Sequence, residues 1–378
     1  MSSMSTMSLL LAGFVGLFFS ALAVDIIETC DDLQGAVSDL QDGDVTVYMH
    51  PFADIVCDNF TTFNITQNHL RVLSSEDLDH FHGHSELLRG RFEVHGTAEL
   101  TWETNLQIEG FEELQDVDGG AIYIHDGGRA RFLNDLTMQD VGVRAVPEED
   151  RDFASYQLQG GCVWTAGYLR VEGLADFENC DISGGGESSP GPGGAIYVED
   201  TGFVVFNGGV EIRDTSILDD EGNNGGGIYN KGTVNIRGKS KFERLYAETA
   251  GAIFNAEGAY FRFKAGATVV FTECKSFDGF AGAVYNDGYM KFAGAALFLD
   301  CSSSSNGGAM VVAADGETIL SENSVFFQIE SGSGSGAPVY VSPGGKVDIP
   351  DTILFIDTSD EDDACRGVFF QDGELCET

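Results

Sequence analysis

Gly193-Gly-Ala-Ile-Tyr197 decides the fold, because close copies of this pentapeptide return along most of the chain. In each copy small residues are followed by an apolar residue and, in most copies, by an aromatic one. The copies begin at Gly119, Gly160, Gly193, Gly225, Ala250, Ala281, Gly307 and Ser335, at intervals of 25 to 41 residues. An internal repeat of this length indicates a solenoid whose loops vary while the centre of each repeat stays constant.

Each repeat contains three short strands. The pentapeptide begins the first strand, and a turn such as Asn255-Ala-Glu-Gly258 ends it. An alternating stretch such as Tyr260-Phe-Arg-Phe263 forms the second strand, and Val269-Val-Phe271 is typical of the third. The repeat leaves no room for crossover helices, and one repeat alone cannot bury its apolar face. The pattern therefore predicts an all-β fold, a parallel β-helix with three short strands per coil.

The turns carry asparagine at one position of three successive repeats, Asn230, Asn255 and Asn286. Asparagine tolerates the left-handed backbone of tight corners. Copies stacked in neighbouring coils have side chains close enough to hydrogen-bond to one another. We therefore predict a structural asparagine ladder, with a ligand site at these residues as the alternative.

A second element precedes several pentapeptides, as in Phe177-Glu-Asn-Cys180, Phe271-Thr-Glu-Cys274 and Phe298-Leu-Asp-Cys301. Together the two elements, over roughly residues 100–345, resemble the repeats of chlamydial polymorphic outer membrane proteins. That family has asparagine where this chain often has cysteine. The chain is also similar to secreted right-handed β-helix proteins of algae and other stramenopiles. The resemblance implies a right-handed coil and an adhesin-like, surface-exposed rod.

The N-terminal region is typical of an exported protein. Residues 1–23 contain no charged side chain, and Ala21-Leu-Ala23 has the small-x-small form of a signal-peptidase site. The apolar run Leu9–Phe19 is short for a membrane span. We expect a secreted protein, extracellular or in a cell wall, with no membrane span after cleavage. Sequons at Asn59 and Asn64 predict glycosylation.

The expected organisation has four parts. Residues 1–23 are the signal peptide, 24–111 an N-terminal capping helix with irregular first coils, 112–350 the repeats, and 351–378 a C-terminal cap. Leu33, Val37 and Leu40 share one face of the capping helix, which covers the open edge of the first coil.

The eight cysteines all follow the signal peptide, and none forms a Cys-x-x-Cys motif. In an exported chain this favours disulfides over a metal site. Cys274 and Cys301 hold the same place in consecutive repeats, and stacked strands lie about 4.8 Å apart, within the range that a disulfide accepts. We predict Cys274–Cys301, and then Cys162–Cys180, Cys30–Cys57 and Cys365–Cys376, the last closing a loop in the C-terminal cap.

The composition limits the partners. Asp and Glu number 61 against 20 Lys and Arg, a formal net charge of −41. This charge excludes a nucleic-acid binder, which needs a basic face for phosphates. It also argues against acidic partners in general. An extracellular polysaccharide or a cell-surface protein remains as the expected partner, and the oligomeric state is left open.

Two groups of residues are candidate metal ligands. His80, His82 and His84 point to one face if the segment is an extended strand, and three imidazoles there suit Zn²⁺ or Cu²⁺. The alternative is an exposed polar loop. Scattered carboxylate clusters such as Asp360-Glu-Asp-Asp363 offer hard oxygen ligands for Ca²⁺, with solvated loops as the alternative. Ca²⁺ is therefore a candidate cofactor besides the transition metals that the histidines could bind, and the sequence establishes neither.

No catalytic signature is present. Asp219-Asp220 and Arg262-Phe-Lys264 match fragments of the polygalacturonase pattern, but the related histidine stretch lies upstream and is inverted. No Gly-x-Ser-x-Gly nucleophile occurs. The leading interpretation is therefore a non-enzymatic rod for surface adhesion or polysaccharide binding. A carbohydrate-active enzyme, a lyase, hydrolase or epimerase, is the first alternative, and a cation- or mineral-associated acidic protein is the second. The loops at 140–158 and 181–192 are the places to look for a site.

Overall fold

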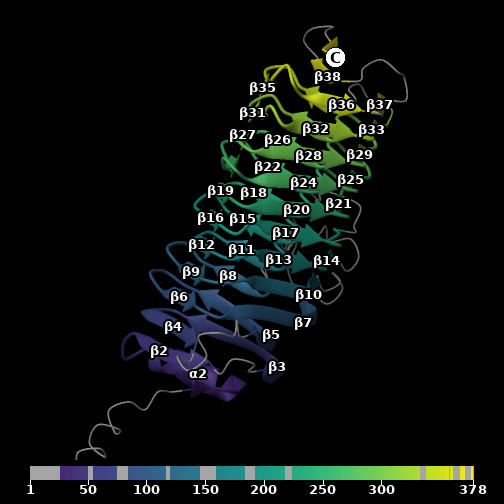
Figure 1. Ribbon diagram of the computed structural model, residues 1–378. Helices are drawn as coiled ribbons and strands as arrows, with labels where there is room; N and C mark the ends of the chain where they lie inside the picture. The colour runs from purple at the N-terminus through teal and green to yellow at the C-terminus, as the bar shows by residue number, and fades with distance from the viewer. Residues whose placement is uncertain are drawn as a thin grey trace, which may run out of the picture.

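The computed structural model describes residues 26–49, 54–74, 84–115, 120–144, 159–183, 192–217, 224–332, 338–356, 358–360, 367–370 and 376–377. The chain winds into a rod of about nine turns, a parallel β-helix with three sheets (Figure 1). The short helix α2 lies at one end of the rod, and β38 lies at the other. The predicted fold class is confirmed.

Sheet A runs the length of the rod and contains β1 (Ile26–Ile27), β2 (Val45–Met49), β4 (His69–Ser74), β6 (Glu99–Trp102), β9 (Arg129–Phe132), β12 (Tyr168–Val171), β16 (Phe203–Phe206), β19 (Thr233–Ile236), β23 (Tyr260–Phe263), β27 (Tyr289–Phe292), β31 (Glu317–Ile319) and β35 (Lys346–Asp348). Sheet C contains β21 (Tyr246–Ala247), β25 (Lys275–Ser276), β29 (Ser302–Ser303), β33 (Glu330–Ser331) and β37 (Ser359–Asp360).

Sheet B consists of two series of strands that merge in the first coils. The motif series, which starts in the pentapeptides, contains β8 (Ile122–Ile124), β11 (Val163–Thr165), β15 (Ile196–Val198), β18 (Ile228–Asn230), β22 (Ile253–Asn255), β26 (Val284–Asn286), β30 (Met310–Val312), β34 (Val339–Val341) and β38 (Val368–Phe370), with β39 (Cys376–Glu377) antiparallel to β38. The second series contains β10 (Leu136–Arg144), β13 (Ala175–Glu178), β17 (Val210–Arg213), β20 (Lys239–Glu243), β24 (Thr268–Thr272), β28 (Ala295–Leu299), β32 (Ser324–Phe327) and β36 (Leu354–Ile356). The longer strands β3 (Asp54–Ile65), β5 (His84–Val94) and β7 (Asn105–Gln115), and the short β14 (Ile182–Ser183), complete the sheet.

Alternation along each strand builds the core. In β23, for example, Phe261 and Phe263 point inward while Tyr260 and Arg262 point outward. In-register pairing places equivalent side chains directly above one another. One inward column is a phenylalanine stack, Phe242, Phe271, Phe298, Phe326 and Phe355, with ring centroids 4.6–5.1 Å apart. Burial of these columns between coils holds the rod together, because no coil has a core of its own.

The capping helix α2 (Cys30–Asp39) forms as predicted. The Thr29 hydroxyl accepts a hydrogen bond from the Asp32 amide, and the Asp32 carboxylate accepts one from the Thr29 amide. These two bonds satisfy amide donors in the first turn of the helix that have no partner within it. Leu33 and Leu40 are buried against the first coil, and Val37 packs at the margin of the core. The helix therefore covers apolar surface that would otherwise be open at the end of the rod.

The three asparagines of the predicted ladder lie one above another and are fully buried. Asn230 Nδ2 donates to Asn255 Oδ1 at 2.7 Å, and Asn255 Nδ2 donates to Asn286 Oδ1 at 2.7 Å. Asn286 Nδ2 extends the chain to Thr318 Oγ1 at 2.8 Å. These bonds link four successive coils and satisfy the three amide donors and the oxygens of Asn255 and Asn286, whereas Asn230 Oδ1, at the start of the ladder, accepts no hydrogen bond from a described residue.

Two of the predicted disulfides are present. Cys30–Cys57 joins the capping helix to β3, and Cys162–Cys180 joins the start of β11 to the corner after β13, each with a Cα–Cα distance of 5.3 Å. The Cys365–Cys376 prediction lies outside the described residues, because Cys365 does.

The predicted Cys274–Cys301 disulfide is wrong, because both residues are free, buried thiols. Residues at equivalent positions of stacked coils have nearly parallel Cα–Cβ bonds, whereas a disulfide needs the two Cβ atoms to approach within about 4 Å. Each sulfur turns instead toward backbone carbonyls, Cys274 Sγ toward Phe242 O at 3.5 Å and Cys301 Sγ toward Leu299 O at 3.4 Å. Burial also raises the pKa of the Cys274 thiol, so this thiol is inert in the native rod.

We therefore predict that iodoacetamide labels neither Cys274 nor Cys301 in the native protein. Both are labelled fully in denaturant without any reductant, because no disulfide has to be opened first. Peptide mass mapping measures both states. A disulfide-linked peptide pair containing these two residues would contradict the structure.

Several predictions concern residues outside the described part of the chain. The signal peptide 1–23, the Asp219-Asp220 pair and most of the two long loops are among them. No helix among the described residues combines the length and apolarity needed to cross a membrane.

Candidate binding face

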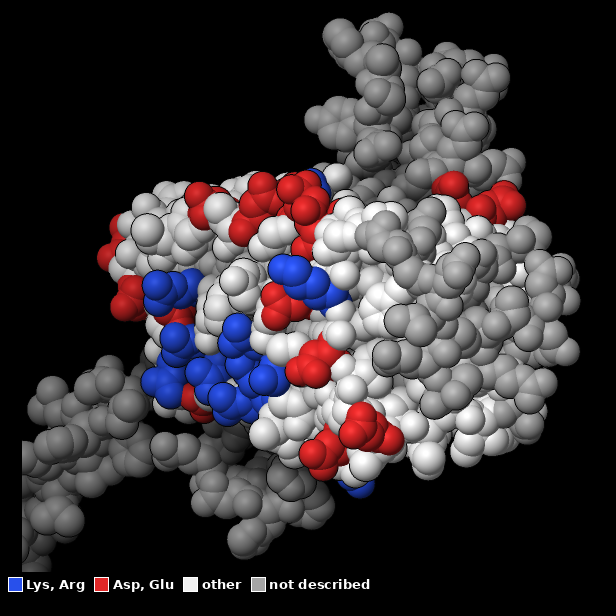
Figure 2. Space-filling model, turned by 90° about the horizontal axis from the view of Figure 1, so that it is seen from above, with Lys and Arg blue, Asp and Glu red and all other residues white. Residues whose placement is uncertain are grey.

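Almost half of the basic residues of this acidic protein lie on sheet A. Nine of the 20 Lys and Arg side chains lie on its strands or directly after them: Arg71, Arg129, Arg131, Arg170, Arg237, Arg262, Lys264, Lys291 and Lys346. Their positions alternate with buried core residues, so the basic side chains line the outer surface. Figure 2 shows Lys and Arg gathered on the left of the view, the side on which Figure 1 places sheet A.

The basic residues of the first coils are neutralised by neighbouring carboxylates. Arg71 contacts Glu103 at 2.6 Å, and Arg131 contacts Glu99 at 3.3 Å. One coil further on, Arg170 Nη2 contacts Glu172 Oε1 at 2.5 Å, two residues along the same segment. These exposed pairs contribute little to stability. They neutralise Arg71, Arg131 and Arg170, whereas Arg129 on β9 makes no salt bridge with a described residue.

Further along sheet A five cations make no salt bridge with a described residue, and four of them lie close together, apart from Lys346 on β35. Arg237, Arg262, Lys264 and Lys291, here called the cationic cluster, make no salt bridge with any residue that the structure describes. Arg262 pairs in register with Lys291, and the strands that end just before Arg237 and Lys264 are likewise paired. The cluster thus forms two adjacent columns over three coils, about 10 Å along the rod.

Like charges lie close to one another around Lys264. The pKa of Lys264 lies below its ordinary value, first because of burial and then because Arg262 and Arg237 repel its charge. A bound anion would relieve this repulsion, because it places opposite charge among three like charges. The site is therefore suited to an anionic ligand, in contrast to the expectation from net charge.

Aromatic rings lie beside the cations. Tyr260 is 47% exposed, and its ring centroid lies 5.4 Å from that of Tyr289. The Arg262 guanidinium carbon lies 5.5 Å from the Tyr260 ring and 5.1 Å from the Tyr289 ring, which holds the cation by cation–π contact. Phe203, 39% exposed, lies two coils below on the same column as Tyr260. Cations and accessible apolar rings thus share one face.

The outward aromatic residues of the motif series differ from these rings. They stack face to face from Tyr123 to Tyr285, with interplanar angles of 4–11° and centroids 4.2–6.4 Å apart. Each ring face is covered by the ring of the next coil, so only edges reach solvent. This column stabilises the stacking of coils and offers no flat platform to a ligand.

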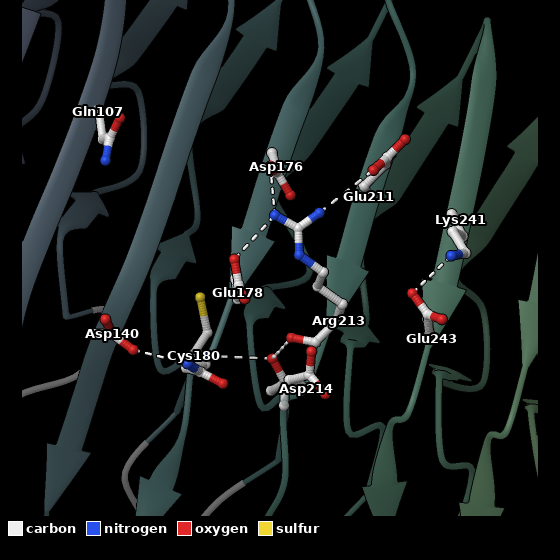
Figure 3. A network of polar contacts seen from close by, with 12 residues as sticks. Gln107, Asp140, Asp176, Glu178, Cys180, Glu211, Arg213, Asp214, Lys241 and Glu243 are labelled. Carbon is white, nitrogen blue, oxygen red and sulfur yellow. Dashed lines mark hydrogen bonds and ion pairs between the residues drawn. The ribbon is translucent and has the colours of Figure 1, made fainter.

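The second series of sheet B carries an extended network of charged side chains (Figure 3). The Arg213 guanidinium contacts Asp176 and Glu178 at 2.9 Å each and Glu211 at 3.5 Å. Burial raises the pKa of Asp176, and Arg213 opposes this shift. Arg213 therefore occupies the space between the carboxylates.

The position of Arg213 between the carboxylates determines what this network can do chemically. A glycosidase of the common type needs its sugar between two carboxyl groups, and here an arginine fills the gap. The neighbouring coil continues the network, with Arg244 bound to Asp214 at 2.5 and 2.6 Å and to Glu243 at 2.7 Å. The arginine lowers the pKa of Asp214 by hydrogen bonding. The network links successive coils as an ion-pair ladder.

The structure brings few of the predicted site residues together. His80, His82 and the side chains of His84 and Asn59 lie outside the described part, whereas Asn64 is exposed on β3. The cationic cluster is not among the sites predicted from the sequence, although two of its members, Arg262 and Lys264, match a fragment of the polygalacturonase pattern. A signal was present in the sequence, because Arg262 and Lys291 occupy the same outward position of consecutive repeats.

Comparison with known proteins gives no relative: the chain matches no family model, no curated protein and no solved structure. The function proposed below therefore rests on the geometry of the outer faces of the rod.

Proposed function

We propose that this chain is a secreted, disulfide-stabilised β-helix rod that binds an acidic polysaccharide along sheet A and leaves the polymer intact. The proposal rests on the cationic cluster, four cations without a salt bridge to any described residue on one face of a protein with net charge −41. Cations that lack carboxylate partners amid such an excess of acids are available to an external anion.

Two features favour a polysaccharide over a small anion. The face is open and repeats at the strand spacing, about 4.8 Å, which suits a linear polymer better than a small molecule that needs a concave pocket. Exposed Tyr260 and Phe203 offer apolar ring surface to sugars next to the charges. The carboxylates or sulfates of an acidic polymer would meet the cations, and the sugar rings would meet the aromatic residues.

The extracellular setting rests on the disulfides. Two are formed, and disulfides persist in oxidising compartments such as the exterior of the cell. The buried asparagine ladder links the coils, and the capping helix covers one end of the rod. The rod is therefore a rigid support for an extended binding face.

Lys264→Glu tests the proposal. We expect it to weaken binding to polygalacturonate and to a sulfated galactan by about tenfold or more, because it replaces attraction by repulsion inside the cluster. Affinity electrophoresis in gels that contain each polymer, or a neutral glucan, measures the retardation. Lys275→Glu is the matched control, because it makes the same charge change on sheet C, and we expect it to retain wild-type retardation.

The same gels separate the remaining interpretations. Retardation by acidic polymers that disappears in high salt supports the proposal, because salt screens the charges of an exposed face. Equal retardation of the two variants, or no retardation of the wild type, contradicts it. Staining for loss of polymer distinguishes binding from the alternative carbohydrate-active enzyme, which would leave a cleared track.

A further inference from the structure

We propose that Glu93, His95 and His125 form a binding site for a divalent transition-metal ion such as Zn²⁺. The site lies on the motif face near the N-terminal end of the rod, away from the cationic cluster. It arises from the register of two coils, because Val94 at the end of β5 pairs with Ile124 at the end of β8. The residues that follow, His95 and His125, therefore occupy the same corner of successive coils.

The three side chains converge. The imidazole rings of His95 and His125 are 3.8 Å apart between centroids, and Glu93 Oε2 lies 3.3 Å from His95 Nε2. One ligand atom from each residue lies within 4.8 Å of the others. Zinc bonds of about 2.0–2.2 Å place tetrahedral ligand atoms about 3.3 Å from one another. The two rings are stacked, with an interplanar angle of 21°, so metal binding requires these partly exposed side chains to rotate until a nitrogen lone pair of each ring points at the ion.

A further residue holds the carboxylate in place. Arg91, only 3% exposed, contacts Glu93 Oε1 at 2.9 Å, while the other oxygen, Oε2, faces His95. The guanidinium of Arg91 packs over the Tyr123 ring at 5.3 Å, which fixes its position. A metal site typically has such an outer partner, which orients a ligand without touching the ion.

The donor set selects the kind of metal. Two imidazole nitrogens and one carboxylate oxygen suit Zn²⁺, Cu²⁺ or Ni²⁺ and do not suit Ca²⁺, which takes six to eight oxygens. A metal ion binds imidazole in its neutral form and carboxylate in its charged form, so binding at this site weakens at low pH. The ion would join two coils, so its binding would stabilise this end of the rod.

Isothermal titration of the full chain, purified without a polyhistidine tag, with Zn²⁺ alone tests the site. We expect one ion per chain in the wild type and a loss of at least about tenfold in affinity for His125→Ala and for Glu93→Gln. Alanine is tolerated at this corner, because Ala166 occupies it in the next coil. Glu93→Gln keeps the shape of the side chain, so it serves if the alanine variant fails to fold.

The matched control removes the competing histidines, His80, His82 and His84, by replacing all three with alanine. We expect this variant to bind Zn²⁺ as the wild type does. Retained binding in His125→Ala together with lost binding in the triple variant would overturn the proposal. The absence of any Zn²⁺ binding by the wild type would overturn it as well.

Discussion

Gly282→Ala is expected to destabilise the rod by about 3–5 kcal/mol, a severe effect for the addition of one methyl group. The backbone of Gly282 passes close to the next coil, and its amide donates to Gly308 O at 3.1 Å. A Cβ atom there would overlap Gly308 O and would lie 2.6 Å from Ser302 O and 2.7 Å from Ser302 N. These are backbone atoms, so the coils must separate locally to admit the methyl group.

Gly35→Ala provides the matched control for this prediction. Gly35 lies in α2, and a Cβ atom built there meets nothing within 4 Å. We expect stability to be unchanged or to increase by up to about 1 kcal/mol, because alanine favours the helix over glycine. Urea unfolding followed by circular dichroism compares the midpoints. Equal midpoints for the two variants would show that the coils are not packed as closely as described.

Asn255→Ala is expected to cost about 2–4 kcal/mol. The substitution removes the middle of the ladder, so Asn230 loses the acceptor of its 2.7 Å bond and Asn286 loses the corresponding donor. All three side chains are fully buried. Asn230 Nδ2 keeps its 3.2 Å bond to Tyr260 O and Asn286 Oδ1 keeps the bond from Gly288 N, so one amide proton of Asn230 is left without a partner. A buried unsatisfied group costs about 1–3 kcal/mol, and the other lost hydrogen bonds add to this. The same urea experiment measures the effect.

Asn134→Ala is the control for the ladder. Asn134 is exposed and donates a single surface hydrogen bond to the Glu103 carbonyl, so its removal should cost less than about 1 kcal/mol. If Asn255→Ala unfolds at the same urea concentration as Asn134→Ala, the buried ladder contributes nothing to the stacking of coils.

The fold could be predicted from the sequence because the same pattern of small, apolar and aromatic residues recurs in every repeat. Every pentapeptide places small residues at the same crowded corner, and every following strand alternates, as in Tyr260-Phe-Arg-Phe263. The asparagine ladder followed from the same register. Cys274 and Cys301 show the limit of such reasoning, because repeat spacing predicts the distance between two Cα atoms but not the direction of their side chains.

The faces were harder to predict than the fold. Net charge averages over the whole surface, so a value of −41 does not reveal that Arg262 and Lys291 pair in register on sheet A with no salt bridge to a described carboxylate. His95 and His125 are 30 residues apart, and only the pairing of β5 with β8 brings them together. By contrast, the sequence alone suggests a metal site at His80, His82 and His84, because these three residues are close together in the chain.

Lysine acetylation with and without bound polygalacturonate tests the binding face most directly. Mass spectrometry gives the labelling rate of each lysine in the two states. Binding along sheet A predicts slower labelling of Lys264 and Lys291 with the polymer bound, and unchanged labelling of Lys275 on sheet C. Unchanged rates at Lys264 and Lys291 in the complex, or protection at Lys275 instead, would contradict the account.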